Sequence, residues 1–541
     1  METKTIKLSV KRSIANILRF GITDVEVFNR PFEIELLKKE QIQNNIVTKI
    51  ADRIKLAYDQ QNIEFLELKP ISHVLVPKKD FFDFRKCALI DIIDEIIFLT
   101  LTLLIAKDVE KSRIKKRDDL LFSYRVDLEN AEEGYIFDPK YNFTEFRNAV
   151  RKKSKLKENN IMISCDISNF YDRLNLHRLE NNLLSIKSID SKVVKLINEV
   201  LLFWSERDSY GLPVGSNASR ILAEAALIEV DEFLKNQKIK FCRFVDDYRI
   251  FTSDASDAHR VLSLLVEKLS RTGLFLNLSK TKIEDISMLF DEVADISVET
   301  SQTIEVNESK IINEKITSEI IRGYSGLIPL KFRKLTQKTI DGLQDQNIIE
   351  IKTKLASSAT IEADLLLLFF KSVVAQNSYQ HLEDASTILQ KFPQFIPYFI
   401  DIINKYKNNM DRKTIEKIQT NIFDWFKNNG FTEYLFIYII RLYDPSNFKE
   451  KSILLDFFRG LKRNVGNYIG RAILELIYGN LSRSEALEIR EYYKRSDLLE
   501  KRQIIKIMIE ALPKEELKPF FKNIIMTERD LFIITLINTN K

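Results

Sequence analysis

An acidic pair, Asp246-Asp247, separates two short apolar segments of the chain, 240–245 and 248–252. Apolar and aromatic segments of this length around two polar residues predict a β-hairpin with the acids at its tip. Like charges held close together on a turn repel each other unless a cation neutralises them. An ordinary polar turn would have the same pattern, so the pair indicates a cation site only together with other acids.

A third carboxylate, Asp166, lies near the end of another apolar segment, 161–167, which reads as a buried strand. If this strand neighbours the hairpin in one sheet, Asp166 faces Asp246 and Asp247. Carboxylate oxygens of this kind favour Mg²⁺. Two such ions, ~3.5–4 Å apart, activate an attacking 3′-hydroxyl and stabilise a leaving pyrophosphate. The alternative for Asp166 is an acid at a strand end that caps a helix.

Two further features follow the acids in an order that suits nucleotide chemistry. Tyr171 comes five residues after Asp166, where its ring could pack under a nucleotide sugar and exclude a 2′-hydroxyl. The loop 211–215 ends at Gly215 and precedes a helix rich in alanine, which could approach a sheet or a template strand closely. A core aromatic and a plain helix-entry turn are the alternatives.

Three basic residues are candidates for phosphate contacts. Lys280 follows the predicted helix 255–272 and could donate a proton to pyrophosphate, and Lys78 and Arg85 could grip a triphosphate. Each residue could equally be an ordinary surface cation. Two basic runs, 111–117 and 151–157, could lie against phosphates or could be solvated helix faces.

The distribution of apolar residues predicts an α+β protein in three parts. Residues 1–159 form an N-terminal region, with a strand, turn and extended piece at 71–84 and a long helix at 88–112. Residues 160–300 are mixed: helices at 174–186, 190–206, 218–235 and 255–272 surround the strands. Residues 301–541 show helical spacing with short polar breaks and no strict repeat period, which favours stacked helix pairs.

Composition excludes some classes of protein. A net charge of +5 is too small to prove a nucleic-acid partner by itself. The three cysteines are far apart, so no disulfide framework or zinc knuckle is expected and a cytoplasmic location fits. No signal peptide is evident, and the most apolar stretch, 89–106, carries three acids, so no membrane span is expected.

Taken in order, the motifs resemble the palm of reverse transcriptases. DISNFYDRL resembles motif A, GLPVGSNASRILAEAAL motif B, CRFVDDYRIF motif C and LNLSKTKI motif D. Upstream, VPKKDFFDFR and LLFSYR resemble the fingers motifs. The sequences of these motifs are most similar to those of bacterial abortive-infection (Abi) and other defence-associated reverse transcriptases. Val214 stands where retroviral and intron enzymes have glutamine, which argues against those branches.

The resemblance implies a fold and a set of roles. It implies reverse-transcriptase-like fingers and palm followed by an all-α helical-repeat (HEAT-like) domain. It implies a DNA polymerase that adds dNTPs with two Mg²⁺ ions held by Asp166, Asp246 and Asp247. Tyr171 would favour dNTPs, and Arg85 with Lys78 would contact the triphosphate. Members form homo-oligomers, act in antiviral defence against phage, and in some cases synthesise DNA without a template or prime from a protein hydroxyl.

Two other functions stay open. The chain could be a templated reverse transcriptase that copies a dedicated non-coding RNA, which the same active site would serve. It could also be an inactive palm whose helical domain acts as a scaffold or binding surface. The presence of all three acids argues against the inactive palm, because a palm without catalytic activity has no need to keep them.

Overall fold

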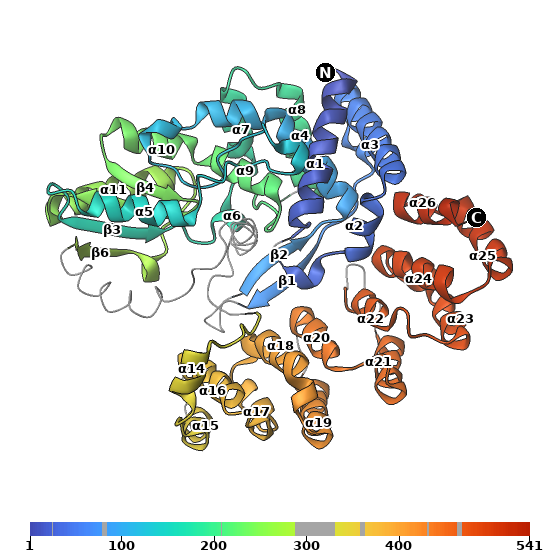
Figure 1. Cartoon of the computed structure of the whole chain (residues 1–541). Helices are drawn as coiled ribbons and strands as arrows, with labels where there is room; N and C mark the ends of the chain where they lie inside the picture. Colours follow the sequence, from blue (N-terminus) through green and yellow to red (C-terminus); the bar gives the residue numbers. More distant parts are fainter. Residues whose placement is uncertain are drawn as a thin grey trace. The chain divides into compact units, whose positions relative to one another are not determined.

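The computed structural model divides into two compact units (Figure 1): Met1–Ile71 with Ala88–Gly323, and Ser72–Cys87 with Tyr324–Lys541. The predicted three-part division, with boundaries at 159/160 and 300/301, stays a prediction. The residues that the structure describes are 1–23, 25–77, 84–206, 208–286, 330–357, 363–429, 432–461 and 468–540.

The first unit begins with helices that pack around α4 (Ile92–Ser112). Helix α1 (Thr3–Phe20) contacts both α4 and α3 (Glu40–Gln60), and α2 (Pro31–Leu37) packs on α3. The predicted start of the long helix at 88 is wrong: strand β2 runs to Leu89, and the Asp91 carboxylate caps α4 by accepting from the Ile93 N–H. None of the helices in the described part of the chain has the length and hydrophobicity of a bilayer span.

Five more helices of this unit lie close to the predicted ranges: α7 (Leu176–Ser185), α8 (Ser191–Trp204), α9 (Asn217–Ala226), α10 (Ile228–Asn236) and α11 (Ala255–Arg271). The single helix expected over 218–235 is therefore two helices, with Leu227 between them. Ser216 is the N-cap of α9, because its Oγ accepts from the Ala218 N–H at 3.1 Å. Side-chain caps of this kind can be predicted from sequence, whereas the break at Leu227 has no such signal.

The central sheet has the strand order β4-β5-β3-β6 and is antiparallel throughout. Its strands are β3 (Ile161–Asp166), β4 (Lys240–Phe244), β5 (Asp247–Thr252) and β6 (Lys282–Asp285).

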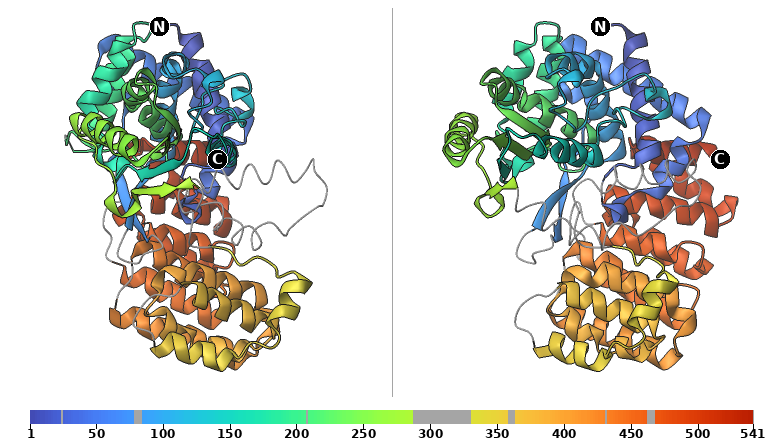
Figure 2. Two further views of the ribbon diagram at one scale, coloured as in Figure 1. Left: turned by 90° about the vertical axis from the view of Figure 1, so that its left-hand side faces the viewer. Right: turned by 60° about the vertical axis from the view of Figure 1, so that its left-hand side comes forward.

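Both faces of the sheet are covered by helices (Figure 2). On one face, Phe146 of α5 (Phe143–Ser154) joins Met162, Cys242 and Phe251 in a buried cluster. On the other face, the hydroxyl of buried Tyr248 donates to Asp231 of α10. Residues therefore alternate between the faces along β4 and β5, as expected for a strand pair with two covered sides.

The second unit combines a two-stranded sheet with helices. Strands β1 (Ser72–Pro77) and β2 (Phe84–Leu89) form the sheet, and α20 packs on β1. The helices are α14 (Gln337–Leu343), α15 (Ile348–Ser357), α16 (Ala363–Ala375), α17 (Ala385–Leu389), α18 (Ile396–Tyr406), α19 (Arg412–Asn429), α20 (Glu433–Ile439), α21 (Phe448–Gly460), α22 (Ile469–Ile477), α23 (Arg483–Glu491), α24 (Leu498–Ala511), α25 (Lys514–Thr527) and α26 (Leu531–Thr539).

These helices stack in series along the array seen in Figure 1. Helix α18 contacts α20, α20 contacts α22, α22 contacts α24 and α24 contacts α26, while α21 packs on α22, α23 on α24, and α25 on α24 and α26. Ion pairs join neighbouring layers at separations that vary, among them 34 residues for Lys451–Glu485, 29 for Arg459–Glu488 and 28 for Arg502–Asp530. The expected stacked helix pairs are present, and this variation agrees with the absence of a strict repeat period in the sequence.

Candidate active site

The structure brings the three predicted carboxylates together at one end of the central sheet. Asp166, the last residue of β3, is the direct partner of Asp247, the first residue of β5. Opposed residues of antiparallel strands point to the same face, with Cβ atoms about 4.5–5.5 Å apart. The Ile167 N–H donates to the Asp246 carbonyl at 3.1 Å, which holds the third acid beside the other two.

The hairpin turn differs from the predicted one by a single residue. Phe244 pairs with Asp247, so the two turn residues are Val245 and Asp246, and Asp247 belongs to the strand. Turns of two residues that match strand twist require a positive φ at the first position. Val245 has φ 56°, a conformation that is unfavourable for a β-branched residue. The prediction of an Asp246-Asp247 turn was wrong because cross-strand pairing, not local composition, sets the register.

Burial and mutual repulsion oppose ionisation of this acidic group. Burial, followed by the charges of Asp166 and Asp247, raises the pKa of Asp246 from its usual 3.8 to about 7. Burial also raises the pKa of Asp247, while nearby Arg249 lowers it. Negative charge here is therefore stable only when a cation neutralises it.

Two cations of the chain already lie against the carboxylates. Lys280 Nζ is 3.1 Å from Asp166 Oδ2, and Arg249 Nη1 is 3.5 Å from Asp247 Oδ1. Lys280 reaches this point because the Asn277 N–H donates to the Asp166 carbonyl at 2.8 Å, which ties the preceding segment to the end of β3. The contact between Lys280 and Asp166 was not foreseen from the sequence, and the phosphate-directed role of Lys280 stays a prediction.

A divalent cation suits this arrangement. In the part of the chain that the structure describes, no three acidic, histidine or cysteine side chains form a ready-made metal site. Lys280 and Arg249 partly neutralise Asp166 and Asp247, and burial together with these two acids raises the pKa of Asp246 to about 7. The Lys280 side chain is 63% exposed, so it can swing away into solvent.

The predicted sugar-contacting residue, Tyr171, lies close enough to Asp246 to feel its charge, and its segment is joined to the predicted loop. Tyr171 lies on α6 (Phe170–Arg173), and burial raises its pKa, with further contributions that include the charge of Asp246. Its carbonyl accepts from the Leu212 N–H at 2.9 Å, which joins the segment after Asp166 to the loop that ends at Gly215. Gly215 has φ 114°, which explains a glycine at that position.

The structure does not test the two predicted triphosphate-binding residues. Lys78 lies outside the described residues. Arg85 lies on β2, which belongs to the second unit. Their proposed roles stay predictions.

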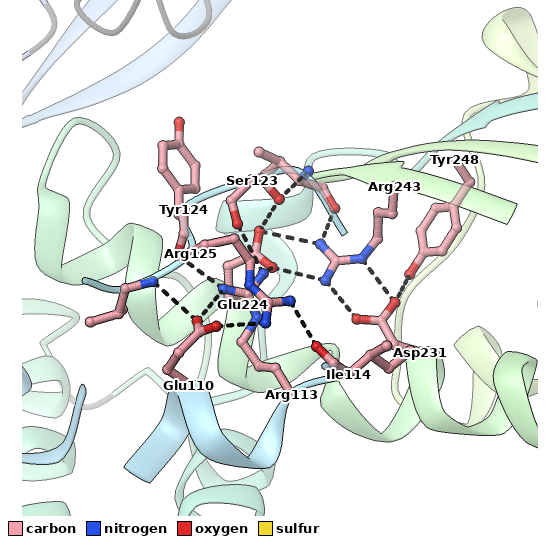
Figure 3. Close-up of polar contacts among 12 residues, drawn as sticks. Glu110, Arg113, Ile114, Ser123, Tyr124, Arg125, Glu224, Asp231, Arg243 and Tyr248 are labelled. Atoms are coloured by element: carbon pink, nitrogen blue, oxygen red, sulfur yellow. Dashed lines mark hydrogen bonds and ion pairs between the residues drawn. The ribbon is translucent and has the colours of Figure 1, made fainter. Parts of the chain in front are cut away.

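Sequence reasoning missed a buried ionic cluster directly behind the hairpin (Figure 3). Its centre is Arg243, which is fully buried and pairs with Glu224 of α9 and Asp231 of α10. Arg113, at the end of α4, also pairs with Glu224. The available signal was an arginine inside the apolar segment 240–245, since a charged residue in a buried strand needs a partner.

Comparisons with known proteins agree with this geometry. Residues 124–306 match the family model described as "Reverse transcriptase (RNA-dependent DNA polymerase)". No curated protein matches the chain.

Solved structures similar to the chain include telomerases, each with a TWJ fragment of telomeric RNA. The one from Candida albicans has 15% identity and a TM-score of 0.28, with 73% of this chain and 67% of that chain covered. The one from Candida tropicalis has 13% identity and a TM-score of 0.27, with coverages of 76% and 73%. The family match, together with the paired carboxylates, leads to one conclusion: the chain contains a reverse transcriptase domain within residues 124–306.

Proposed function

We propose that this protein is a DNA polymerase that adds dNTPs to a 3′-hydroxyl by metal-dependent phosphoryl transfer. The observation that carries the proposal is the pairing of Asp166 with Asp247 beside Asp246, on strands that belong to the matched domain. Three neighbouring carboxylates, of which Asp246 is buried and ionises with difficulty, are suited to hold divalent cations between them.

In this proposal, Asp166 and Asp246 are the principal metal ligands and Asp247 supports them. Two Mg²⁺ ions bound there would activate the attacking hydroxyl and neutralise the leaving pyrophosphate. Lys280 would leave Asp166 for the pyrophosphate, where its ammonium donates a proton or a hydrogen bond. Tyr171 would pack against the nucleotide sugar, and the backbone at Gly215 would let the chain approach the substrate closely.

Incorporation of labelled dNTPs by the purified full chain tests this activity. We expect wild-type incorporation that depends on Mg²⁺, and its loss in Asp246→Asn. The matched control is Asp119→Asn, which makes the same chemical change in another acidic pair of the chain, where Asp118 is bound to Lys235 instead. Absence of labelled product from wild type with any template, or equal incorporation by Asp246→Asn, would refute the proposal.

The same preparation distinguishes untemplated from templated synthesis. We propose untemplated, protein-primed synthesis, which rests on the resemblance of the motifs to those of the Abi group and on Val214. Nuclease treatment before the assay should then leave activity intact, and label should stay with the protein through denaturation. Loss of activity after the nuclease, with product complementary to a co-purified transcript, would favour the templated alternative.

We further propose that the second unit is a HEAT-like repeat domain and that the protein acts as a homo-oligomer in antiphage defence. Helices that contact each other in series, α18 to α20, α20 to α22, α22 to α24 and α24 to α26, support the repeat assignment. Cells that express wild type should resist phage, and cells that express Asp246→Asn should not. Equal protection by both would favour the inactive-palm alternative, in which the helical unit acts as a scaffold.

A further inference from the structure

The catalytic hairpin is held in an unfavourable backbone conformation. Val245 precedes Asp246 and has φ 56°, and a left-handed β-branched residue persists only where its surroundings enforce it. Both polar groups of its backbone have buried side-chain partners. The Val245 N–H donates to Ser123 Oγ at 2.9 Å, and its carbonyl accepts from Arg243 Nη1 at 2.7 Å.

Every N–H donor of the Arg243 side chain is used in a hydrogen bond, which holds the side chain in place. A guanidinium has five N–H donors. Two of its hydrogen bonds go to Asp231, at 2.9 and 2.6 Å, two go to Glu224, at 3.2 and 2.8 Å, and the fifth goes to Val245. The side chain is 0% exposed, so water cannot replace a lost partner.

Ser123 is fixed in the same way. Its hydroxyl donates to Glu224 and accepts from Val245, so both of its functions are used (Figure 3). The segment that carries it runs beside β4, since the Arg243 N–H donates to the Leu120 carbonyl and the Phe122 N–H donates to the Arg243 carbonyl. Glu224 also binds Arg113, and although burial opposes its ionisation, Arg113 and Arg243 outweigh that effect and lower its pKa.

We infer that Ser123, Glu224 and Arg243 are positioning residues for catalysis: together they clamp the Val245 backbone and thereby set where the Asp246 carboxylate lies. This inference rests on the proposed function for its catalytic consequence. Glu224 comes from α9 and Ser123 from the segment after α4, so the clamp joins both to the hairpin. Because Val245 resists its own conformation, loss of the clamp should let the turn relax and displace Asp246.

The variants separate the clamp from general stability. Ser123→Ala removes one of the two contacts to Val245. Val245→Gly removes the strain, because glycine adopts positive φ without cost. The double variant therefore combines a missing clamp with a turn that no longer needs one. Ser13→Ala is the control, since Ser13 is equally buried and bonds to Ser9 and Thr100, away from the hairpin.

Three measurements on the full chain report the result. Loss of one buried hydrogen bond corresponds to about a tenfold change in rate or equilibrium. In Ser123→Ala we expect kcat for dNTP incorporation to fall about tenfold with little change in KM. Mn²⁺ affinity, measured by electron paramagnetic resonance, should fall similarly, and amide exchange of peptides covering 241–248 should become faster. Val245→Gly in the same chain should restore most of the kcat and Mn²⁺ affinity.

Each outcome decides the inference. Unchanged kcat, Mn²⁺ affinity and exchange in Ser123→Ala would overturn it, as would equal impairment of the single and double variants or of Ser13→Ala. If Ser123→Ala does not fold, the comparison of Val245→Gly with Val245→Ala decides: the glycine variant must melt at a higher temperature, and an equal or lower one would overturn the inference. If wild type incorporates no nucleotide, the proposed function fails, and Mn²⁺ affinity and amide exchange still test the clamp.

Discussion

Replacing Asp246 by asparagine should stabilise the metal-free fold above neutral pH. The folded pKa of about 7 lies above the usual 3.8, so the fold binds this proton more tightly than the unfolded chain does. The resulting stability is fully present below about pH 4 and is lost as pH rises through 7. At 1.36 kcal/mol per pH unit, ionised Asp246 costs the fold about 4 kcal/mol. Asparagine has a similar shape and no such cost.

The assay is amide exchange of β3 and β5 in the full chain at pH 5, 6, 7 and 8 with EDTA. Exchange of buried amides reports the opening free energy of this sheet alone, which suits a chain of two units. After correction for the intrinsic pH dependence of exchange, Asp246→Asn should exceed wild type by only about 1.6 kcal/mol at pH 5, because the cost of ionisation begins to accumulate above the usual pKa of 3.8. The difference in opening free energy between Asp246→Asn and wild type should then grow to as much as about 4 kcal/mol at pH 8. Asp119→Asn, an exposed site, should follow wild type throughout.

Addition of Mg²⁺ should reduce the difference in stability between Asp246→Asn and wild type. A ligand at 100 times its Kd stabilises the state that binds it by about 2.7 kcal/mol. Mg²⁺ should stabilise wild type by this amount and Asp246→Asn by less. The difference between the opening free energies of the two proteins should therefore become smaller. Parallel pH profiles of the two proteins in EDTA would show that Asp246 is not a buried, repelled acid, and the electrostatic reasoning would be wrong.

Two further predictions concern other parts of the chain. Burial raises the pKa of Glu95 to about 8 despite a hydrogen bond from Ser216, so wild-type stability should fall as pH rises through 8. Glu95→Gln should abolish that fall, seen as melting temperatures at pH 6 and 9 that differ less than those of wild type. Gly470→Ala should destabilise the second unit by about 1–3 kcal/mol, because a Cβ there would lie 1.7 Å from Oε1 of buried Glu500. Gly342→Ala, with no atom within 4 Å, should instead stabilise it by about 0.5–1 kcal/mol in denaturant unfolding, and equal effects of the two changes would contradict the packing.

Several elements could be predicted from the sequence because their signals are local. The strand at 161, the hairpin after 240, and the helices α7, α8 and α11 follow from apolar periodicity, and Ser216 from helix-capping chemistry. The acids were recognisable for the same reason. Each stands at the end of a short apolar run, which is where a strand meets its turn.

The way in which these elements meet depends on tertiary contacts that no local signal predicts. Pairing of Phe244 with Asp247 moved the turn back by one residue and placed the strain on Val245. Contact with Asp166 gave Lys280 a partner that lies 114 residues away, and Glu224 became the partner of Arg243 across two helices. Strand register and buried ion pairs depend on which distant surfaces of the chain pack together and exclude water. The free energy of that packing comes from the whole core and not from any one segment.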